Sequence, residues 1–163
     1  MKKLIIIRHA KAEQAFTMDK QRKLTEKGHH DARMMAERLL AEGYKIDKLF
    51  SSTATRAYQT ATHFAEVHGI APQSIKTFDS LYLAGTLEIT LTIEWLKENV
   101  KTLAVVAHNP GVSDFTNDST NTINDFLPTS GIAIIEVDIN DWEEDFEAAE
   151  KKLIAILKPK DEQ

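Results

Sequence analysis

The chain alternates short apolar runs with longer amphipathic stretches, and this alternation restricts its fold more than any other feature. The apolar runs at 4–7 and 102–107 are typical of strands buried within a sheet. Residues 24–43 and 53–69 instead carry the apolar spacing of helices that cover such a sheet. The alternation predicts a three-layer α/β/α fold with a mostly parallel central sheet and helices on both faces.

The same reading places further elements along the chain. Strands are expected at 46–52, 73–78, 102–109, 131–137 and 151–157, and a helix at 110–120. Thr25 is a plausible N-cap, and Gly43 and Gly69 are plausible helix ends. Residues 86–99 are rich in β-branched side chains, but Leu87, Leu91 and 93–95 favour a helix. The last two strands are expected to form a hairpin-like pair, and the length of 163 residues suits a single domain, 1–163.

Composition excludes several classes of protein. The chain has no cysteine, which removes disulfides, thiol catalysis and thiolate zinc sites and is consistent with a cytoplasmic protein. No apolar run approaches the roughly 20 residues of a membrane helix, so no membrane partner is expected. The net charge of -5 and the absence of a basic face with interleaved aromatics argue against nucleic acid.

The charges are unevenly distributed. Residues 1–27 hold eight Lys and Arg against three Asp and Glu, whereas residues 138–150 hold seven Asp and Glu and no Lys or Arg. A basic N-terminal end favours an anionic ligand. The acidic stretch is interpreted as a solvated connector, and whether it recognises a partner stays open.

Polar residues follow three of the expected strands. Arg8 and His9 end the first strand, Arg56 lies on the first turn of the helix after the second, and His108 and Asn109 end the strand at 102–109. Ligands of α/β sheets bind beyond the carboxyl ends of the strands. The sequence therefore predicts a cationic pocket that gathers two guanidinium groups and two imidazoles.

These residue types suit the chemistry of a phosphoryl group. Arginine forks match phosphate oxygens, and the N-terminus of a helix adds N–H donors. A neutral imidazole is a competent nucleophile, and Arg8 and Arg56 should depress the pKa of His9 and keep it unprotonated. A protonated His108 would stabilise charge in the transition state. This chemistry needs no metal, and the sequence shows no metal-ligand constellation: His29 and His30 are expected on the surface, and His63 and His68 lack the i, i+4 spacing of a metal pair.

Three motifs together resemble the histidine phosphatase superfamily: "IIIRHAKAE", "SSTATRAYQT" and "VVAHNPGV". They look most like those of its small SixA-like phosphohistidine phosphatases. The resemblance implies a phosphoglycerate mutase-like fold, a covalent phosphohistidine on His9, and a phosphate pocket of Arg8, Arg56 and His108, with Asn109 from the third motif beside it.

The resemblance leaves the proton donor open. Many members carry a glutamate acid after the second helix and third strand, but this chain has "DSLYLAGTLE" there, and neither Asp79 nor Glu88 clearly replaces it. "MDKQRKLT" is similar to a SixA-like segment and offers Asp19 for acid–base help and Arg22 for substrate binding. Ala10 stands where many members have glycine.

The leading hypothesis is a cofactor-independent phosphatase that removes phosphate from phosphohistidine on a signalling or phosphotransfer protein. The absence of a clear acid favours this substrate. The pKa of a protonated imidazole is about 6.5, so imidazole is a good leaving group. An alkoxide, whose conjugate acid has a pKa of about 15.7, needs a proton before it can leave. Two alternatives remain: a phosphatase of a small phosphomonoester such as a sugar phosphate, and a phosphate-dependent binding module without turnover. The oligomeric state is not predicted.

Overall fold

A computed structural model describes residues 1–14 and 16–159. The predicted domain 1–163 therefore includes five residues outside the described part. The described strands are β1 (Lys2–Arg8), β2 (Lys48–Ser52), β3 (Lys76–Phe78), β4 (Thr102–Ala107), β5 (Ile132–Val137) and β6 (Lys151–Leu157). The helices are α1 (Glu26–Ala41), α2 (Thr55–His68), α3 (Thr86–Ile93) and α4 (Gly111–Thr120), with 3-10 turns η1 (Asp19–Gln21), η2 (Pro72–Ser74) and η3 (Asp79–Leu81).

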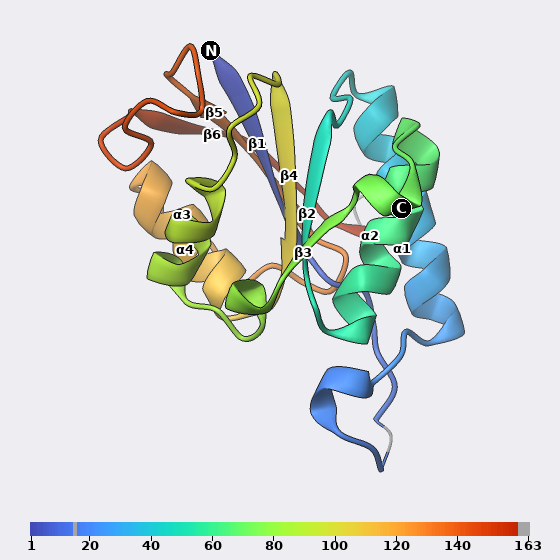
Figure 1. Ribbon diagram of the computed structural model, residues 1–163. Coiled ribbons are helices and arrows are strands. Elements are labelled where there is room, and N and C mark those ends of the chain that lie inside the picture. The colour runs from blue at the N-terminus through green and yellow to red at the C-terminus, as the bar shows by residue number, and fades with distance from the viewer. Residues whose placement is uncertain (15, 160–163) are drawn as a thin grey trace.

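The strands form one sheet in the order β3-β2-β4-β1-β5-β6. The first four run parallel, with Ile6 opposite Val105 in β4, and β5 and β6 are antiparallel additions at one side. The predicted mostly parallel sheet and the final hairpin-like pair are confirmed. Figure 1 shows the parallel strands pointing the same way, so that their carboxyl ends meet at one edge.

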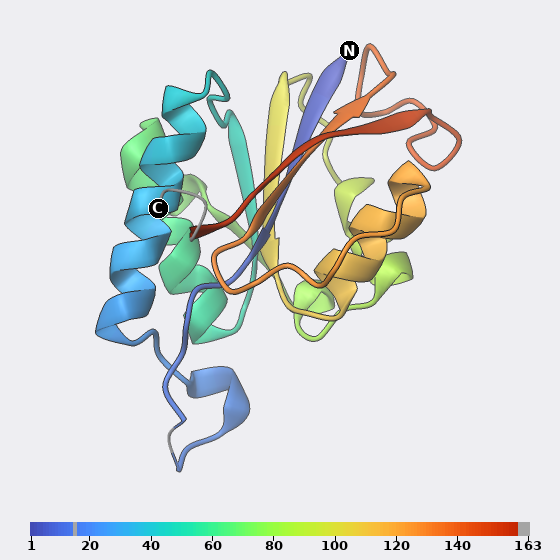
Figure 2. The same ribbon diagram turned by 180° about the vertical axis from the view of Figure 1, so that it is seen from behind.

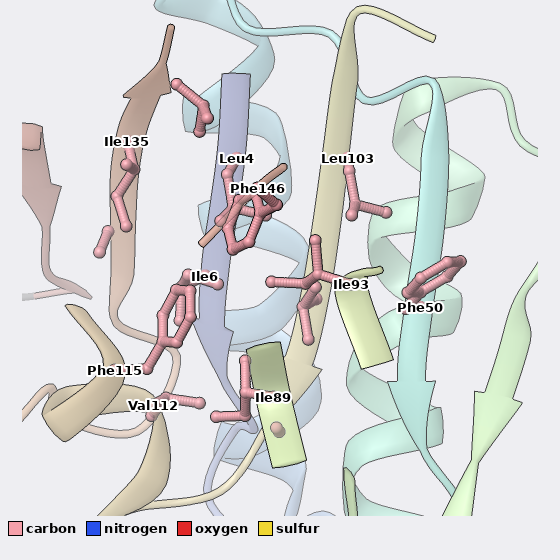
Figure 3. Packing of buried hydrophobic residues seen from close by; sticks show 14 of the residues in the cluster. Leu4, Ile6, Phe50, Ile89, Ile93, Leu103, Val112, Phe115, Ile135 and Phe146 are labelled. Atoms are coloured by element: carbon pink, nitrogen blue, oxygen red, sulfur yellow. The ribbon is translucent and has the colours of Figure 1, made fainter. Parts of the chain in front are cut away.

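Two helical layers cover the sheet, one on each face. Helices α1 and α2 pack together on one face, and α3 and α4 lie on the other (Figures 1 and 2). The side chains of β1 alternate between the layers: Ile5 and Ile7 join the cluster beneath α1 and α2, and Leu4 and Ile6 join the cluster beneath α3 and α4. Figure 3 shows this second cluster, with Ile89 of α3 packed over the sheet. A strand buried on both faces must be apolar throughout, which accounts for the run at 4–7.

The predicted helix signals act as expected at three ends. The hydroxyl of Thr25 accepts a 2.9 Å hydrogen bond from the backbone N–H of Gly28 and caps α1. Gly69 adopts a left-handed conformation, with φ of 75°, and terminates α2. Gly43 follows α1 with φ of 96°. The sequence therefore fixes where α1 begins and where both helices end.

Several predicted boundaries are wrong. β3 is only three residues long because Pro72–Ser74 form a 3-10 turn where the strand was expected to begin. Helix α3 was expected over 86–99 but ends at Ile93, and Leu87, Leu91 and Trp95 are exposed. Leu40 of α1 and Tyr58 of α2 are also exposed, at 37% each.

The acidic stretch 138–150 is more than a solvated connector. It joins β5 to β6, but its two large aromatic side chains, Trp142 and Phe146, are each 1% exposed and belong to the core cluster under α3 and α4. The indole N–H of Trp142 donates a 2.7 Å hydrogen bond to the carbonyl of Val100. The carboxylates therefore solubilise a segment that is anchored by its aromatics. Within the described residues, no helix is long and apolar enough to cross a membrane.

Candidate active site

Three adjacent strands bring the predicted residues together at the carboxyl edge of the sheet. β4 lies between β1 and β2. It ends just before His108, β1 ends in Arg8 and is followed by His9, and β2 leads into the first turn of α2, which carries Arg56. The backbone N–H of His9 continues the pairing with β4 through a 3.1 Å bond to Ala107. Residues that are far apart in the sequence therefore lie close together in the site, because the strands that carry them are adjacent in the sheet.

The ring of His9 is held in one tautomer. Its Nδ1 lies 2.7 Å from the backbone carbonyl of Ala10, and because a carbonyl can only accept, Nδ1 carries the proton. The backbone N–H of Ala10 in turn donates to the hydroxyl of Thr60, at 2.9 Å. The lone pair of His9 therefore resides on Nε2, which faces Arg56 with a 3.4 Å separation from its Nε.

Arg56 links the parts of the site. It is 2% exposed, and its guanidinium lies between the two imidazoles, with Nη2 3.4 Å from Nδ1 of His108. The other side of the fork donates to the loop before α1: Nη1 to the carbonyl of Asp19 at 2.8 Å and Nη2 to its carboxylate at 3.1 Å. A buried, anchored guanidinium is preorganised to bind an anion at Nε2 of His9.

His108 is oriented by the end of β2. Its Nε2 lies 2.8 Å from the hydroxyl of Ser52, and its ring is 5.2 Å from that of His9 between centroids. Arginine can only donate, so the Nδ1 that faces Arg56 accepts, and Nε2 carries the proton toward Ser52. The ring of Tyr82 packs edge-on against His108, with 5.6 Å between centroids.

Both imidazoles are neutral in the free protein. Burial is the main cause that lowers the pKa of His9 to about 4; the charges of Arg56 and Arg8 act in the same direction, and the hydrogen bond to the Ala10 carbonyl acts against them. The predicted direction is thus confirmed, although burial is a larger cause than the arginines. Burial, followed by the effects of His9 and Arg56, lowers the pKa of His108 to about 3. The protonated form of His108, which the sequence analysis considered for stabilising charge in the transition state, is therefore disfavoured in the free protein.

A pocket of about 420 Å³ opens over these groups. Arg8, His9, Arg56 and His108 all line it, together with Arg22. Arg8 donates from Nη1 to the carbonyl of Leu127, and burial lowers the pKa of its guanidinium without removing its charge. Three guanidinium groups around two neutral imidazoles suit a small, doubly charged anion.

Asp19 enters the site from η1 as a carboxylate. The hydroxyl of Tyr82 donates to it at 2.5 Å and lowers its pKa to about 2, and the bonds from Arg56 and Arg22 act in the same direction. A carboxyl group with this pKa holds no proton at neutral pH. The acid role considered for Asp19 is therefore not favoured, and its bonds suit a group that positions Arg56.

Two further predicted residues also line the pocket but are engaged by protein. Arg22 donates to Asp19 at 3.1 Å and to the carbonyl of Glu13 at 3.2 Å, so it braces the loop. The amide of Asn109 donates to the carbonyl of Leu127 at 2.8 Å, and its oxygen accepts from Ser113 at 2.5 Å. Asn109 therefore holds the pocket wall with both ends of its side chain.

Sequence reasoning missed the groups that orient the others. Ser52, Thr60 and Tyr82 carry none of the charge that marks a site, and their roles depend on contacts across 50 to 63 positions of sequence, as in the bond between Tyr82 and Asp19. The available signal was weak: Ser52 and Thr60 lie within the "SSTATRAYQT" motif, and Tyr82 lies in the segment searched for an acid.

The remaining candidates for that acid lie elsewhere. The carboxylate of Glu88 accepts from the backbone N–H of Gly85 at 2.9 Å and caps α3. Asp79 is bound by Lys20 and Thr53, at 2.9 and 2.7 Å. Neither is among the residues that line the pocket.

The other histidines form no metal cluster. Among the described residues, no group of three or more His, Cys, Asp or Glu is arranged to hold a metal ion. His29 is not simply a surface residue, because its Nδ1 lies 2.8 Å from Nε2 of His63 and bridges α1 to α2. His68 is 1% exposed and is bonded to the backbone of Ile46 and Ala36, so it is structural.

Comparison with known proteins gives a consistent picture. Residues 4–112 match the Histidine phosphatase superfamily (branch 1). The chain is 31% identical over 129 residues to an uncharacterised protein of Mycobacterium leprae, covering 73% of this chain and 76% of that protein. It is also 30% identical over 107 residues to a 2,3-bisphosphoglycerate-dependent phosphoglycerate mutase of Mesorhizobium japonicum, a match that spans 60% of this chain and about half, 52%, of the mutase.

Solved structures share the whole fold. The protein histidine phosphatase SixA complexed with tungstate superimposes with a TM-score of 0.84 and 22% identity over 99% of both chains. A candidate phosphohistidine phosphatase SixA from Agrobacterium tumefaciens gives 0.77 and 27% identity over 97% of this chain and 98% of the other. By its sequence motifs, the order of its strands and the residues at their carboxyl ends, the chain belongs to the histidine phosphatase superfamily, in its SixA-like branch.

Proposed function

We propose that the protein is a phosphatase that forms a covalent phosphohistidine on His9 and acts on phosphohistidine of a signalling or phosphotransfer protein. One observation carries the proposal: Nε2 of His9 is an unprotonated nitrogen, fixed by the Nδ1 bond to Ala10 and facing Arg56 in a pocket lined by arginines. Such a nitrogen is ready to attack phosphorus.

In the first step, Nε2 of His9 forms a bond to phosphorus while the bond between phosphorus and the substrate nitrogen breaks. The electron pair of the broken bond stays on the departing imidazole, whose other nitrogen already carries a proton, so it leaves neutral. Arg8 and Arg56 hold the equatorial oxygens. The entering charge also favours proton uptake by His108, whose low pKa in the free protein reflects burial and nearby cations.

In the second step, water attacks phosphorus and the bond to Nε2 of His9 breaks. The electron pair returns to Nε2, and both protons of the water leave with the phosphate. Each step therefore balances with no proton supplied by a carboxylic acid. The arginines supply the charge that a metal ion supplies in other phosphatases, so the scheme needs no cofactor.

The state of Asp19 supports a nitrogen–phosphorus substrate. With a pKa of about 2 it cannot donate a proton at neutral pH, and Glu88 and Asp79 have other partners. An alkoxide leaving group, whose conjugate acid has a pKa of about 15.7, would depart slowly without such a donor. An imidazole needs none.

A small phosphomonoester remains a second candidate. The phosphoglycerate mutase relatives support it, as does the likeness of fold to a mycobacterial glucosyl-3-phosphoglycerate phosphatase, with a TM-score of 0.70 at 15% identity. A binding module without turnover is less well supported, because the unprotonated Nε2 of His9 and the arginines proposed to bind the anion share one pocket.

The test measures phosphate release from a phosphotransfer domain phosphorylated on histidine, with chelator present, beside release from a sugar phosphate and an aryl phosphate. We expect fast release from the phosphodomain, slow release from the esters, and none from His9→Ala. Faster release from the sugar phosphate would transfer the function to a small metabolite. Phosphate binding without release from any substrate would favour the binding module.

A further inference from the structure

A row of exposed apolar side chains lies along α3. Leu83, Leu87, Leu91 and Trp95 are 60%, 62%, 52% and 68% exposed. Leu87 and Leu91 are one helical turn apart and therefore share a side of α3, while Leu83 and Trp95 continue the four-residue spacing just before and after the helix. Single exposed apolar residues are ordinary, but four of them on and beside one short helix are characteristic of an interaction site. We refer to these four residues as the α3 ridge.

The composition of α3 shows that its outer side is unusual. The sequence TLEITLTI contains one charged residue, Glu88, and that carboxylate is used to cap Gly85. Ile89 and Ile93 face the core, as Figure 3 shows, while Leu87 and Leu91 face solvent. A helix that is apolar on both sides is normally covered on both. The ridge therefore has the character of a surface that is covered in a complex.

The ridge begins at the active site. Leu83 lines the same pocket as His9 and Arg56. It directly follows Tyr82, whose hydroxyl is bonded to Asp19. From there α3 runs away from the edge of the sheet at which the pocket lies (Figure 1). One bound molecule could thus contact the pocket and the ridge together.

The size of the ridge indicates the kind of molecule. The eight residues of α3 extend about 12 Å, at about 1.5 Å per residue. A sugar phosphate held at His9 fills the pocket and has no apolar surface for Leu87 or Leu91. The occupant needs a doubly charged phosphoryl group for the pocket and an adjacent apolar surface for the ridge, and a helix that carries both offers ridges that pack against α3.

We propose that the α3 ridge is the docking surface for an apolar helix face of the phosphohistidine-bearing substrate protein, next to its phosphorylated histidine. This inference rests on the proposed function and adds to it the place where the substrate protein is held. Docking at the ridge lowers the KM for a phosphoprotein and leaves the chemistry at His9 unchanged, because Leu87 and Leu91 do not line the pocket.

The test compares two substrates and three proteins. The substrates are a helical phosphotransfer domain phosphorylated on histidine and an aryl phosphate. The proteins are wild type, the double variant Leu87→Ser/Leu91→Ser, and a control variant, Ile154→Ser. The control removes an exposed apolar residue of β6, away from the ridge. We expect the double variant to raise KM for the phosphodomain about tenfold or more, as for the centre of an interface. Its turnover of the aryl phosphate, and both activities of the control, should match wild type.

Trp95 supplies a direct readout. It is 68% exposed, whereas Trp142, the second tryptophan, is 1% exposed. In a His9→Ala background, which keeps the substrate bound, the phosphodomain should shift the emission of Trp95 to shorter wavelength and protect it from acrylamide. The emission of Trp142 should not change.

The outcomes separate the two proposals. If wild type releases phosphate from the aryl ester and not from the phosphodomain, the proposed function fails and the docking surface with it. If wild type turns over the phosphodomain and the double variant does so with unchanged KM, only the docking surface is overturned. If the double variant loses both activities, the fluorescence of the His9→Ala protein decides. An emission of Trp95 that does not change when the phosphodomain is added overturns the docking surface. A dimer that dissociates in the double variant, with phosphodomain turnover unchanged, would assign the ridge to a second copy.

Discussion

At the residue scale, the state of the His9 ring decides the chemistry. The carbonyl of Ala10 fixes the proton on Nδ1, and burial together with Arg56 and Arg8 lowers the pKa of the ring to about 4. Because the lowered pKa belongs to a base, the ring is neutral above about pH 4 and becomes protonated only below it. Nε2 is then available across the neutral range.

This state can be measured by nitrogen-15 NMR of the imidazoles. We expect Nδ1 of His9 to carry the proton and Nε2 to remain unprotonated down to about pH 5, with titration near 4. The exposed His30 serves as an internal control in the same spectra. A His9 ring that titrates with an ordinary pKa near about 6.5, or that carries its proton on Nε2, would contradict the assigned nucleophile.

The same low pKa affects stability, with a definite sign. Between the folded-state pKa of about 4 and the unfolded value of about 6.5, the unfolded chain binds more protons at this site than the folded protein. The contribution of His9 is therefore complete above about pH 6.5 and is lost as the pH falls toward 4. Denaturant unfolding of wild type and His9→Gln between pH 7 and about 4.5 should converge as the pH falls; a constant difference would argue against a buried neutral ring.

Asp19 offers a second test at this scale. If it positions Arg56, Asp19→Asn should lower kcat/KM by a similar factor, about tenfold, for leaving groups of every pKa. If it donated a proton, the loss would grow with the pKa of the leaving group. A series of aryl phosphates separates the two, with Asp79→Asn, outside the pocket, as the control.

The residues of the pocket could be predicted because they lie at the ends of strands or in the first helical turn that follows one. Arg8, His9, Arg56 and His108 are charged or titratable groups beside apolar runs, and the sheet order brings them together. The tautomers, the charge state of Asp19 and the role of Tyr82 could not be predicted. They depend on burial and on single hydrogen bonds between loops, neither of which has a pattern in sequence.

At the element scale, the pocket depends on the close approach of α4 to the turn before α3. A Cβ added at Gly111, the first residue of α4, would lie 1.8 Å from the carbonyl oxygen of Ala84. That turn also carries Leu83, and α4 begins three residues after His108. Glycine is therefore required at this position because a side chain would clash with Ala84. The backbone of Gly111 is not in the left-handed region, so its conformation does not by itself require glycine.

We expect Gly111→Ala to destabilise the protein by about 1–3 kcal/mol through overpacking and to reduce turnover by displacing one wall of the pocket. Gly85→Ala is the matched control, because its Cβ would meet only the flexible carboxylate of Glu88, at 3.2 Å. Denaturant unfolding and aryl phosphate turnover measure both effects. Equal stability of the two variants would show that α4 can move freely from this turn.

Helices and strands with a single clear apolar pattern in the sequence were predicted well. Elements whose apolar residues fit more than one pattern were predicted poorly. The apolar runs of β1 and β4 and the capped α1 have one interpretation each. In α3, apolar residues on both sides leave no polar face to define its orientation, so the sequence did not indicate that Leu87, Leu91 and Trp95 face solvent. The extent of β3 depended on Pro72, whose 3-10 turn replaces the expected start of the strand.

At the scale of the whole molecule, the acidic connector ties the antiparallel β5–β6 pair to the core. Phe146 stacks with Phe115 of α4, with 6.4 Å between ring centroids, and contributes to the cluster in Figure 3. Phe146→Ala should lower the free energy of unfolding by about 3–5 kcal/mol, as for a buried aromatic. Glu143→Ala, an exposed neighbour, should change it by less than about 0.5 kcal/mol. Similar values for the two would mean that the connector is not part of the folded core.

The central claim is that His9 carries the phosphoryl group during turnover. The most direct measurement is a rapid base quench of the enzyme with a phosphodomain in excess, followed by mass analysis of its peptides. The account predicts a phosphoryl group that is stable to base and labile to acid on the peptide containing His9, and none in His9→Asn. Turnover with no phosphorylated peptide at any quench time, or with the group on His108 instead, would contradict it.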